Sequence, residues 1–281
     1  LYGLVCMLAF LFLQVVFRNN AGPDLLIILL FVVHPLHTEV VANIKSRDVM
    51  LAFAFGLLSA LVYIRGLDGK GWYNYLLSLL LLIAAFLSRE NGIVFAGLLG
   101  LVTFYRRPLS VPKDWLRYVM PVVVGFIVLL LIRLFVFSDG FFQTDASELA
   151  SKGLLFYDGF VGNPMVDLYA QPMLRTLNIL YLNMLYVVKF FVPCPLVHDY
   201  AYDHLPLVGF SDTNAWLGAT FFFALLILLY KGLRERRVYG FGLAFYFITL
   251  SVYLQIGGTG PDIFAERYMF GPLLGLSIAL V

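Results

Sequence analysis

The sequence contains little charge. Asp, Glu, Lys and Arg make up 13% of its residues, whereas they make up about a quarter of an ordinary soluble domain. Hydrophobic residues account for 62%, and the mean hydropathy is +0.90. This composition excludes an ordinary soluble domain and predicts a membrane protein. The net charge of +2 is too small to indicate a nucleic-acid partner, and no basic run is long enough to suggest one.

Cysteine is also scarce. Cys6 lies in an apolar run and Cys194 lies between two prolines, so neither has the spacing of a metal ligand and no disulfide is inferred. No signal peptide is visible. Because both ends lie inside apolar runs, we expect residues 1–281 to be a fragment of one longer transmembrane domain.

Long apolar runs are abundant. Several approach the roughly 20 residues that a helix needs to cross a bilayer, and a helix satisfies its own backbone hydrogen bonds there. The sequence predicts an all-α, polytopic transmembrane bundle with about nine crossings and one interfacial or re-entrant segment. The topology of residues 21–33 and 176–193 stays open, because the first is short and the second is the most polar. The runs are 1–17, 25–33, 49–64, 72–87, 93–105, 118–137, 176–193, 215–230, 239–256 and 268–281.

Basic residues gather in alternate connections. Lys and Arg concentrate in cytoplasmic loops, so we place these connections in the cytoplasm. The opposite side then receives the mixed polar clusters and an extended external region, 138–214, with an interfacial helix. The basic residues that set this orientation are Arg18, Arg65, Lys70, Arg106, Arg107, Lys113, Arg117, Lys231, Arg234, Arg236 and Arg237.

The stretch HPLHTEVVANIKSRD, residues 34–48, is the richest polar cluster. If the chain is helical after Pro35, then Glu39, Asn43 and Arg47 share one face. Such a stripe suits a polar headgroup, with Arg47 taking a phosphate. The alternative is a solvated loop in which Ser46 or Asp48 caps the next helix.

Two histidines belong to the same stretch. His34, His37 and Glu39 suit zinc chemically, but they do not form a His-Glu-x-x-His pattern and no cysteine joins them. Histidines that orient their neighbours or a substrate through hydrogen bonds are the favoured interpretation.

Charged pairs also mark two other segment boundaries. Ser88-Arg89-Glu90-Asn91 joins two apolar runs, and Ala265-Glu266-Arg267-Tyr268 follows a glycine-rich turn. Charges at such depth are costly unless they pair or line a cavity, so a local ion pair and the wall of a site are both open. Arg133 is near the end of its run, where we expect it to snorkel to the interface. Several clusters on one side of the bundle predict a shared site.

The order of these motifs resembles a known family. HPLHTEVVANI with SRD, then LSREN, then the run from NPMVDLYAQP to VPCPLVHDYAYDH, then AERYMFGPLLGLS are similar to the transmembrane and tetratricopeptide-repeat-containing O-mannosyltransferases and their bacterial relatives. These belong to the glycosyltransferase C superfamily. The resemblance spans most of residues 25–280.

The resemblance implies an enzyme that moves a mannose-like sugar from a polyprenyl-phosphate donor to a hydroxyl acceptor, mainly Ser or Thr of a protein, with inversion at the lumenal or periplasmic face. It implies no cofactor and no metal, because the lipid-linked sugar is a substrate. The catalytic base is unknown here and is expected upstream of Leu1, and tetratricopeptide repeats are expected after the last helix. The substrate-binding residues that it implies are His34, His37, Glu39, Arg47, Asp48, Arg89, Glu90, His198, Asp199, Glu266 and Arg267.

Two other functions stay open at this point. A transporter or flippase would also carry intramembrane charges, but no internal symmetry of the kind that transporters show is visible. A non-catalytic membrane scaffold is the second alternative. The expected partners of the protein are membrane lipid, the lipid-linked donor and the acceptor. The form NIKSRD favours the bacterial inner membrane over the endoplasmic reticulum.

Overall fold

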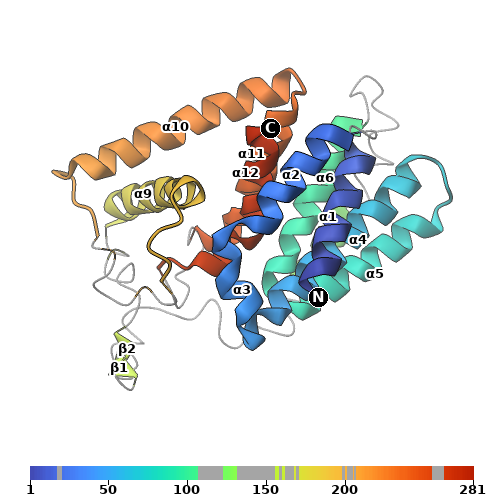
Figure 1. Cartoon of the computed structure of the whole chain (residues 1–281), viewed down its shortest axis with the longest axis horizontal. Helices are drawn as coiled ribbons and strands as arrows, with labels where there is room; N and C mark the ends of the chain where they lie inside the picture. The colour runs from blue at the N-terminus through green and yellow to red at the C-terminus, as the bar shows by residue number, and fades with distance from the viewer. Residues whose placement is uncertain are drawn as a thin grey trace.

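The computed structural model describes residues 1–17, 21–106, 123–131, 156–157, 160–161, 168, 171–197, 200, 205, 207–254 and 263–281. The predicted all-α class is confirmed (Figure 1). The strands among the described residues are a two-residue antiparallel pair, β1 (Phe156–Tyr157) and β2 (Phe160–Val161). The α-helices are α1 (Tyr2–Val16), α2 (Ala21–Val33), α3 (Thr38–Ala42), α4 (Arg47–Leu67), α5 (Tyr73–Ser88), α6 (Val94–Arg106), α9 (Pro172–Phe191), α10 (Thr213–Arg234), α11 (Val238–Leu250) and α12 (Phe270–Leu280). Residues 123–131 are also helical.

Short 3₁₀ turns separate several of these helices. They are η1 (Pro35–His37), η2 (Ile44–Ser46), η3 (Glu90–Ile93), η5 (Ser251–Tyr253) and η6 (Glu266–Met269). Most of them coincide with the polar motifs of the sequence. The charged motifs therefore mark the ends of helices.

The number of membrane crossings differs from the prediction. Among the described residues, two helices are long and apolar enough to cross a membrane, Ile44–Leu67 and Thr213–Arg234. The segments Gly22–Val33 and Pro35–Ala42 make a third only if they count as one span bent by 53°. The apolar helices Tyr2–Val16, Tyr73–Ser88 and Val238–Tyr253 fall short of about 20 residues, and α9, which has 20, is not among the apolar spans. Nine crossings are therefore not confirmed. Residues 21–33, whose topology was left open, form the helix α2.

The helices pack as antiparallel neighbours around an aromatic core. α4 packs on α5, and α11 packs on α12. Phe53 lies 5.4 Å from Phe270 and 5.5 Å from Phe95, measured between ring centroids. At Gly242 and Gly275, α11 and α12 approach so closely that a Cβ on Gly242 would lie 2.6 Å from the carbonyl oxygen of Gly275. Small residues permit this close backbone contact.

Two ends of this bundle differ in chemistry. At the first, the basic end, Arg106 forms an ion pair with Asp68 at 2.9 Å, and the Tyr105 hydroxyl donates to the carbonyl of Arg237 at 2.9 Å. The connections α4–α5 and α10–α11 and the end of α6 therefore meet there, as the charge pattern predicted. Its cytoplasmic placement stays a prediction. The second, the polar end, comprises Glu39, Asp48, Arg89, Glu266 and Arg267.

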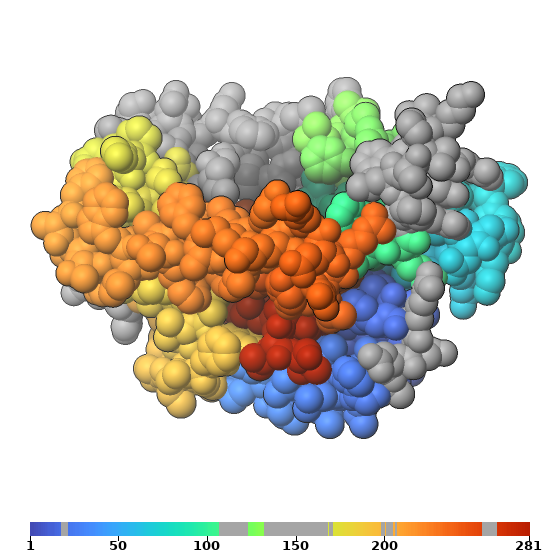
Figure 2. Space-filling view, turned by 90° about the horizontal axis from the view of Figure 1, so that it is seen from above, coloured from blue at the N-terminus to red at the C-terminus, as the bar shows by residue number. Residues whose placement is uncertain are grey.

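The helix α10 lies apart from the central helices. It packs on α9 and α11 and runs across one face of the molecule (Figure 2). Its apolar side chains stay largely outside the core: Trp216, Leu217, Phe223 and Ile227 are all more than half exposed. Such a surface suits contact with hydrocarbon, because it is costly to leave in water.

Candidate functional site

The chain changes direction at residues 34–47. Asn43 has an extended backbone (φ −90°, ψ 120°), and its side-chain oxygen accepts the amide hydrogen of Lys45 at 3.0 Å. This local hydrogen bond competes with helix continuation. The predicted continuous stripe of Glu39, Asn43 and Arg47 is therefore wrong. Arg47 lies exposed at the first position of α4.

Neither proposed cap closes α4 in the usual way. Ser46 occupies the N-cap position but its side chain makes no capping hydrogen bond. The carboxylate of Asp48 instead accepts the amide hydrogen of Val49 at 2.7 Å. Asp48 thus stays near the start of α4 with its second oxygen free to meet another motif.

Glu39 is held by residue 267. Its two carboxylate oxygens accept hydrogen bonds from the guanidinium of Arg267 at 2.6 Å and from the backbone amide of the same residue at 2.7 Å. The Glu39 side chain is 4% exposed and that of Arg267 is 22% exposed. These charge-assisted bonds join residues 228 positions apart in the sequence. The first and last motifs of the chain therefore form one structure.

Glu266 faces the other way, toward α9 and the segment after it. One of its oxygens accepts from the backbone amide of Val197 at 3.0 Å and from the hydroxyl of Tyr200 at 3.0 Å. The ammonium of Lys189 lies 3.5 Å from the same oxygen. Burial, followed by the adjacent Glu266 carboxylate, raises the pKa of Tyr200, so this hydroxyl remains a donor at neutral pH.

Asp48 and Arg89 form a second ion pair, at 2.8 Å, which joins the starts of α4 and η3. Beside it, the Asn91 amide bonds the hydroxyl of Tyr253. The Tyr253 ring stacks on Tyr268 with 4.1 Å between centroids.

The guanidinium of Arg267 lies over the ring of Tyr268, with its Cζ atom 5.4 Å from the ring centroid. The two ion pairs are thus linked through aromatic side chains. Glu90 lies half-buried next to Arg89, at the start of η3.

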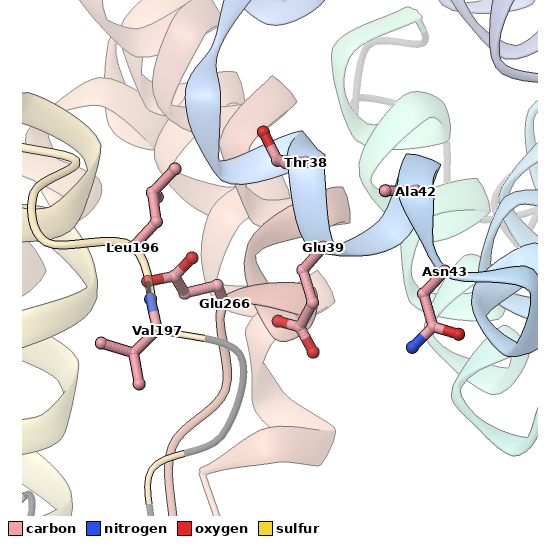
Figure 3. A pocket seen from close by; sticks show the side chains of 7 residues that line it. All are labelled: Thr38, Glu39, Ala42, Asn43, Leu196, Val197 and Glu266. Atoms are coloured by element: carbon pink, nitrogen blue, oxygen red, sulfur yellow. Dashed lines mark hydrogen bonds between the residues drawn. The ribbon is translucent and has the colours of Figure 1, made fainter.

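A cavity of about 530 Å³ opens at the polar end. Figure 3 shows Glu39 and Asn43 on one side and Glu266 with Val197 on the other. The cavity therefore has carboxylates on two sides and an apolar wall. Its lining residues are Thr38, Glu39, Ala42, Asn43, Leu196, Val197 and Glu266.

The two histidines do not line this cavity. The Nε2 atom of His34 lies 2.9 Å from the carbonyl oxygen of Phe190, and its ring stacks on that of Phe190. His37 is buried between the rings of Phe31 and Phe270, with centroids 4.5 and 4.9 Å away. His34 therefore fastens the start of η1 to α9, and His37 is a core residue.

His198 and Asp199 lie outside the described residues, as does Arg133. Their described neighbours Val197 and Tyr200 both donate to Glu266. Within the described part of the chain, no group of three or more His, Cys, Asp or Glu side chains is placed to hold a metal ion. Cys6 and Cys194 are both free thiols.

Sequence reasoning missed several residues of this site. Lys189 and Tyr200 bind Glu266, and Tyr253, which bonds Asn91 of the predicted motif, connects the two ion pairs. Lys189 had a visible signal, because it is a charge in the last turn of a predicted membrane segment. The tyrosines had none, since aromatic residues are common throughout this chain.

Three ion pairs gather at the polar end. Arg89, Lys189 and Arg267 bring three cations to one end of the bundle, and a carboxylate orients each of them. Guanidinium groups that are fixed in this way bind phosphate oxygens through paired hydrogen bonds. The cavity beside them has room for a sugar-sized group.

The chain is similar over most of its length to protein O-mannosyl-transferases. It is 27% identical to human protein O-mannosyl-transferase TMTC4 over 92% of this chain and 37% of that protein. It is 22% identical to protein O-mannosyl-transferase F38B6.6 of Caenorhabditis elegans over 89% of this chain and 33% of that protein. With human protein O-mannosyl-transferase TMTC2 the identity is 27% over 75% of this chain and 26% of that protein.

These relatives confirm the resemblance predicted from the motifs. The chain spans about a third of the length of the relatives that it matches best in coverage. No family model matches it, and no solved structure matches it. The relatives are animal proteins, so a bacterial inner membrane stays a prediction.

Proposed function

We propose that this chain is the membrane part of a glycosyltransferase that moves a mannose-like sugar from a polyprenyl-phosphate donor to a hydroxyl acceptor, mainly Ser or Thr of a protein. The observation that carries the proposal is the joining of Glu39 to Arg267 beside a cavity of about 530 Å³. Similarity to protein O-mannosyl-transferases supports this reaction class.

The reaction breaks the bond between the anomeric carbon and the phosphate oxygen and forms a bond from that carbon to the acceptor oxygen. The acceptor proton passes to a base, and polyprenyl phosphate leaves. Inversion requires the acceptor and the phosphate on opposite faces of the sugar. The base belongs, in this proposal, to a part of the protein that precedes Leu1.

Cations stabilise the charge that develops on the leaving phosphate. Arg267 is the first candidate for this role, because its partner Glu39 lines the cavity and its guanidinium suits two phosphate oxygens. Glu39 orients Arg267 through the hydrogen bonds to its side chain and backbone. Arg89, oriented by Asp48, is the second candidate.

Glu266 has a different role in this proposal. Three donors from α9 and the segment after it already point at one of its oxygens. The Glu266 carboxylate therefore positions this segment against the cavity. Residues next to Glu266 contact the substrate. The roles of Glu90, and of His198 and Asp199, which lie outside the described residues, stay predictions from the resemblance.

The test is transfer of labelled mannose from polyprenyl phosphate to a Ser/Thr peptide by the complete protein that contains this chain. Arg267→Lys keeps the charge and loses the planar, two-point geometry, so we expect kcat/KM to fall about tenfold or more. Arg65→Lys, in the last turn of α4 at the basic end, is the matched control and should keep full activity.

Thermal unfolding of both variants confirms that folded proteins are compared. Failure of the unaltered protein to consume any polyprenyl-phosphate sugar would contradict the proposed reaction. Equal activities of the Arg267→Lys and Arg65→Lys variants would instead contradict the role of Arg267.

A further inference from the structure

A second cavity lies away from the polar end. It has a volume of about 390 Å³ and is formed by α6, α10 and α11. It shares no lining residue with the cavity beside Glu39. Its walls are apolar, and they include Leu101, Phe104, Leu229, Leu233, Phe247 and Ile248.

This groove reaches the basic end of the bundle. Leu233 stands one residue before Arg234, where α10 ends, and Phe104 stands two residues before Arg106, where α6 ends. α10 and α11 touch there, because a Cβ on Gly232 would lie 2.5 Å from the Cα of Gly240. The apolar walls are therefore held together close to the water-facing turn.

Positive charge stands at the edge of the same groove. The guanidinium of Arg236 lies 5.1 Å from the centre of the Phe104 ring, and Phe104 is a wall residue. Lys231, Arg234 and Arg237 are exposed on the same turn. Glu235 offsets part of this charge through its 3.2 Å pair with Arg237. An excess of positive charge remains.

We propose that this groove binds an anionic phospholipid, with one acyl chain between α6, α10 and α11 and the phosphate against the Arg236 turn. The apolar walls match the acyl chain, and the turn complements the charge of the headgroup. Basic residues next to a bilayer attract anionic lipids by roughly fivefold in affinity for each charge. The polyprenyl donor does not fit this place, because its phosphate belongs at the opposite end under the proposed function.

The test is native mass spectrometry of the complete protein, purified in detergent, with added phosphatidylglycerol or phosphatidylcholine of identical acyl chains. We expect phosphatidylglycerol to bind at least fivefold more tightly. Arg236→Gln should weaken that binding about fivefold, whereas Arg65→Gln, a charge removed at the same end but away from the groove, should leave it unchanged.

A second pair of variants tests the walls. Leu229→Trp fills the groove and should reduce binding of phosphatidylglycerol, whereas Ile227→Trp changes an exposed position of the same helix and should not. Equal affinity for the two lipids, or equal effects within either pair of variants, would overturn the proposal. Displacement of phosphatidylglycerol by polyprenyl phosphate at the same concentration would overturn it too, because the groove would then be a donor site.

Discussion

The most buried ion pairs lie at the polar end and the most exposed one lies at the basic end, while Asp48–Arg89 and Asp68–Arg106 are intermediate. At the polar end, Glu39 and Glu266 have side chains that are each 4% exposed, and each pairs with a cation far away in the sequence. At the basic end, Glu235 and Arg237 are 54% and 66% exposed and lie two residues apart.

This difference separates two uses of charge. Taking a charge out of water is expensive, so a buried pair persists where it holds distant segments together or serves a ligand. An exposed pair contributes little to stability, and the orientation role predicted for its basic member does not depend on the pair. The following predictions test this comparison from the largest expected effect to the smallest.

Arg267→Gln should be the most damaging change. It leaves the buried Glu39 carboxylate without its cation, and breaking such a pair costs about 3 kcal/mol or more. Thermal unfolding of the detergent-solubilised protein measures this loss. A loss below 1 kcal/mol would show that Glu39 finds water or another donor, and the contrast between the ends would disappear.

Glu266→Gln should have an intermediate effect. The amide keeps the size of the carboxylate but loses the charge that Lys189 and two other donors share, for a cost of about 1–3 kcal/mol. The amide hydrogen of Val197, which donates to Glu266, should then exchange with solvent faster by about tenfold or more. An unchanged exchange rate would mean that other contacts fix this segment.

Asn43→Ala should have a smaller effect. The change removes the side-chain oxygen that accepts the Lys45 amide hydrogen, and losing such a cap costs about 1 kcal/mol. Lys45→Ala, which keeps the backbone donor, serves as the control. Circular dichroism should show no loss of helix in either variant, because alanine favours a helical backbone over the extended one at residue 43.

Arg237→Gln should have the smallest effect. The pair with Glu235 is exposed, so its loss should change the free energy of unfolding by less than about 1 kcal/mol. The same unfolding measurement as for Arg267→Gln provides the direct comparison. A loss equal to that of Arg267→Gln would remove the distinction between the ends.

The helices could largely be predicted from the sequence, because apolar runs determine where they lie. The run 215–230 became α10, Thr213–Arg234, and the run 49–64 became α4, Arg47–Leu67. The number of crossings could not be predicted, since several runs became helices shorter than the bilayer needs. The apolar composition of a run does not determine the residue at which its helix ends.

The residues that belong to the site were easier to predict than the pairs that they form. Cost of burial indicated that Arg89, Glu266 and Arg267 either pair or line a cavity, and the structure gives each of them an ion-pair partner. Which partner each takes depends on how the helices pack, so the pairing of Glu39 with Arg267 was not visible. The break at Asn43 was missed because a side-chain hydrogen bond outweighed the helical pattern.

The adjacency of Glu266 and Arg267 has a mechanical consequence. These neighbours are joined by a single peptide unit, yet one is fastened to the segment after α9 and the other to α3. The amide of this peptide unit itself donates to Glu39. A ligand that shifts the peptide unit, and not the guanidinium alone, is therefore expected to disturb the bond between Glu266 and Val197 as well.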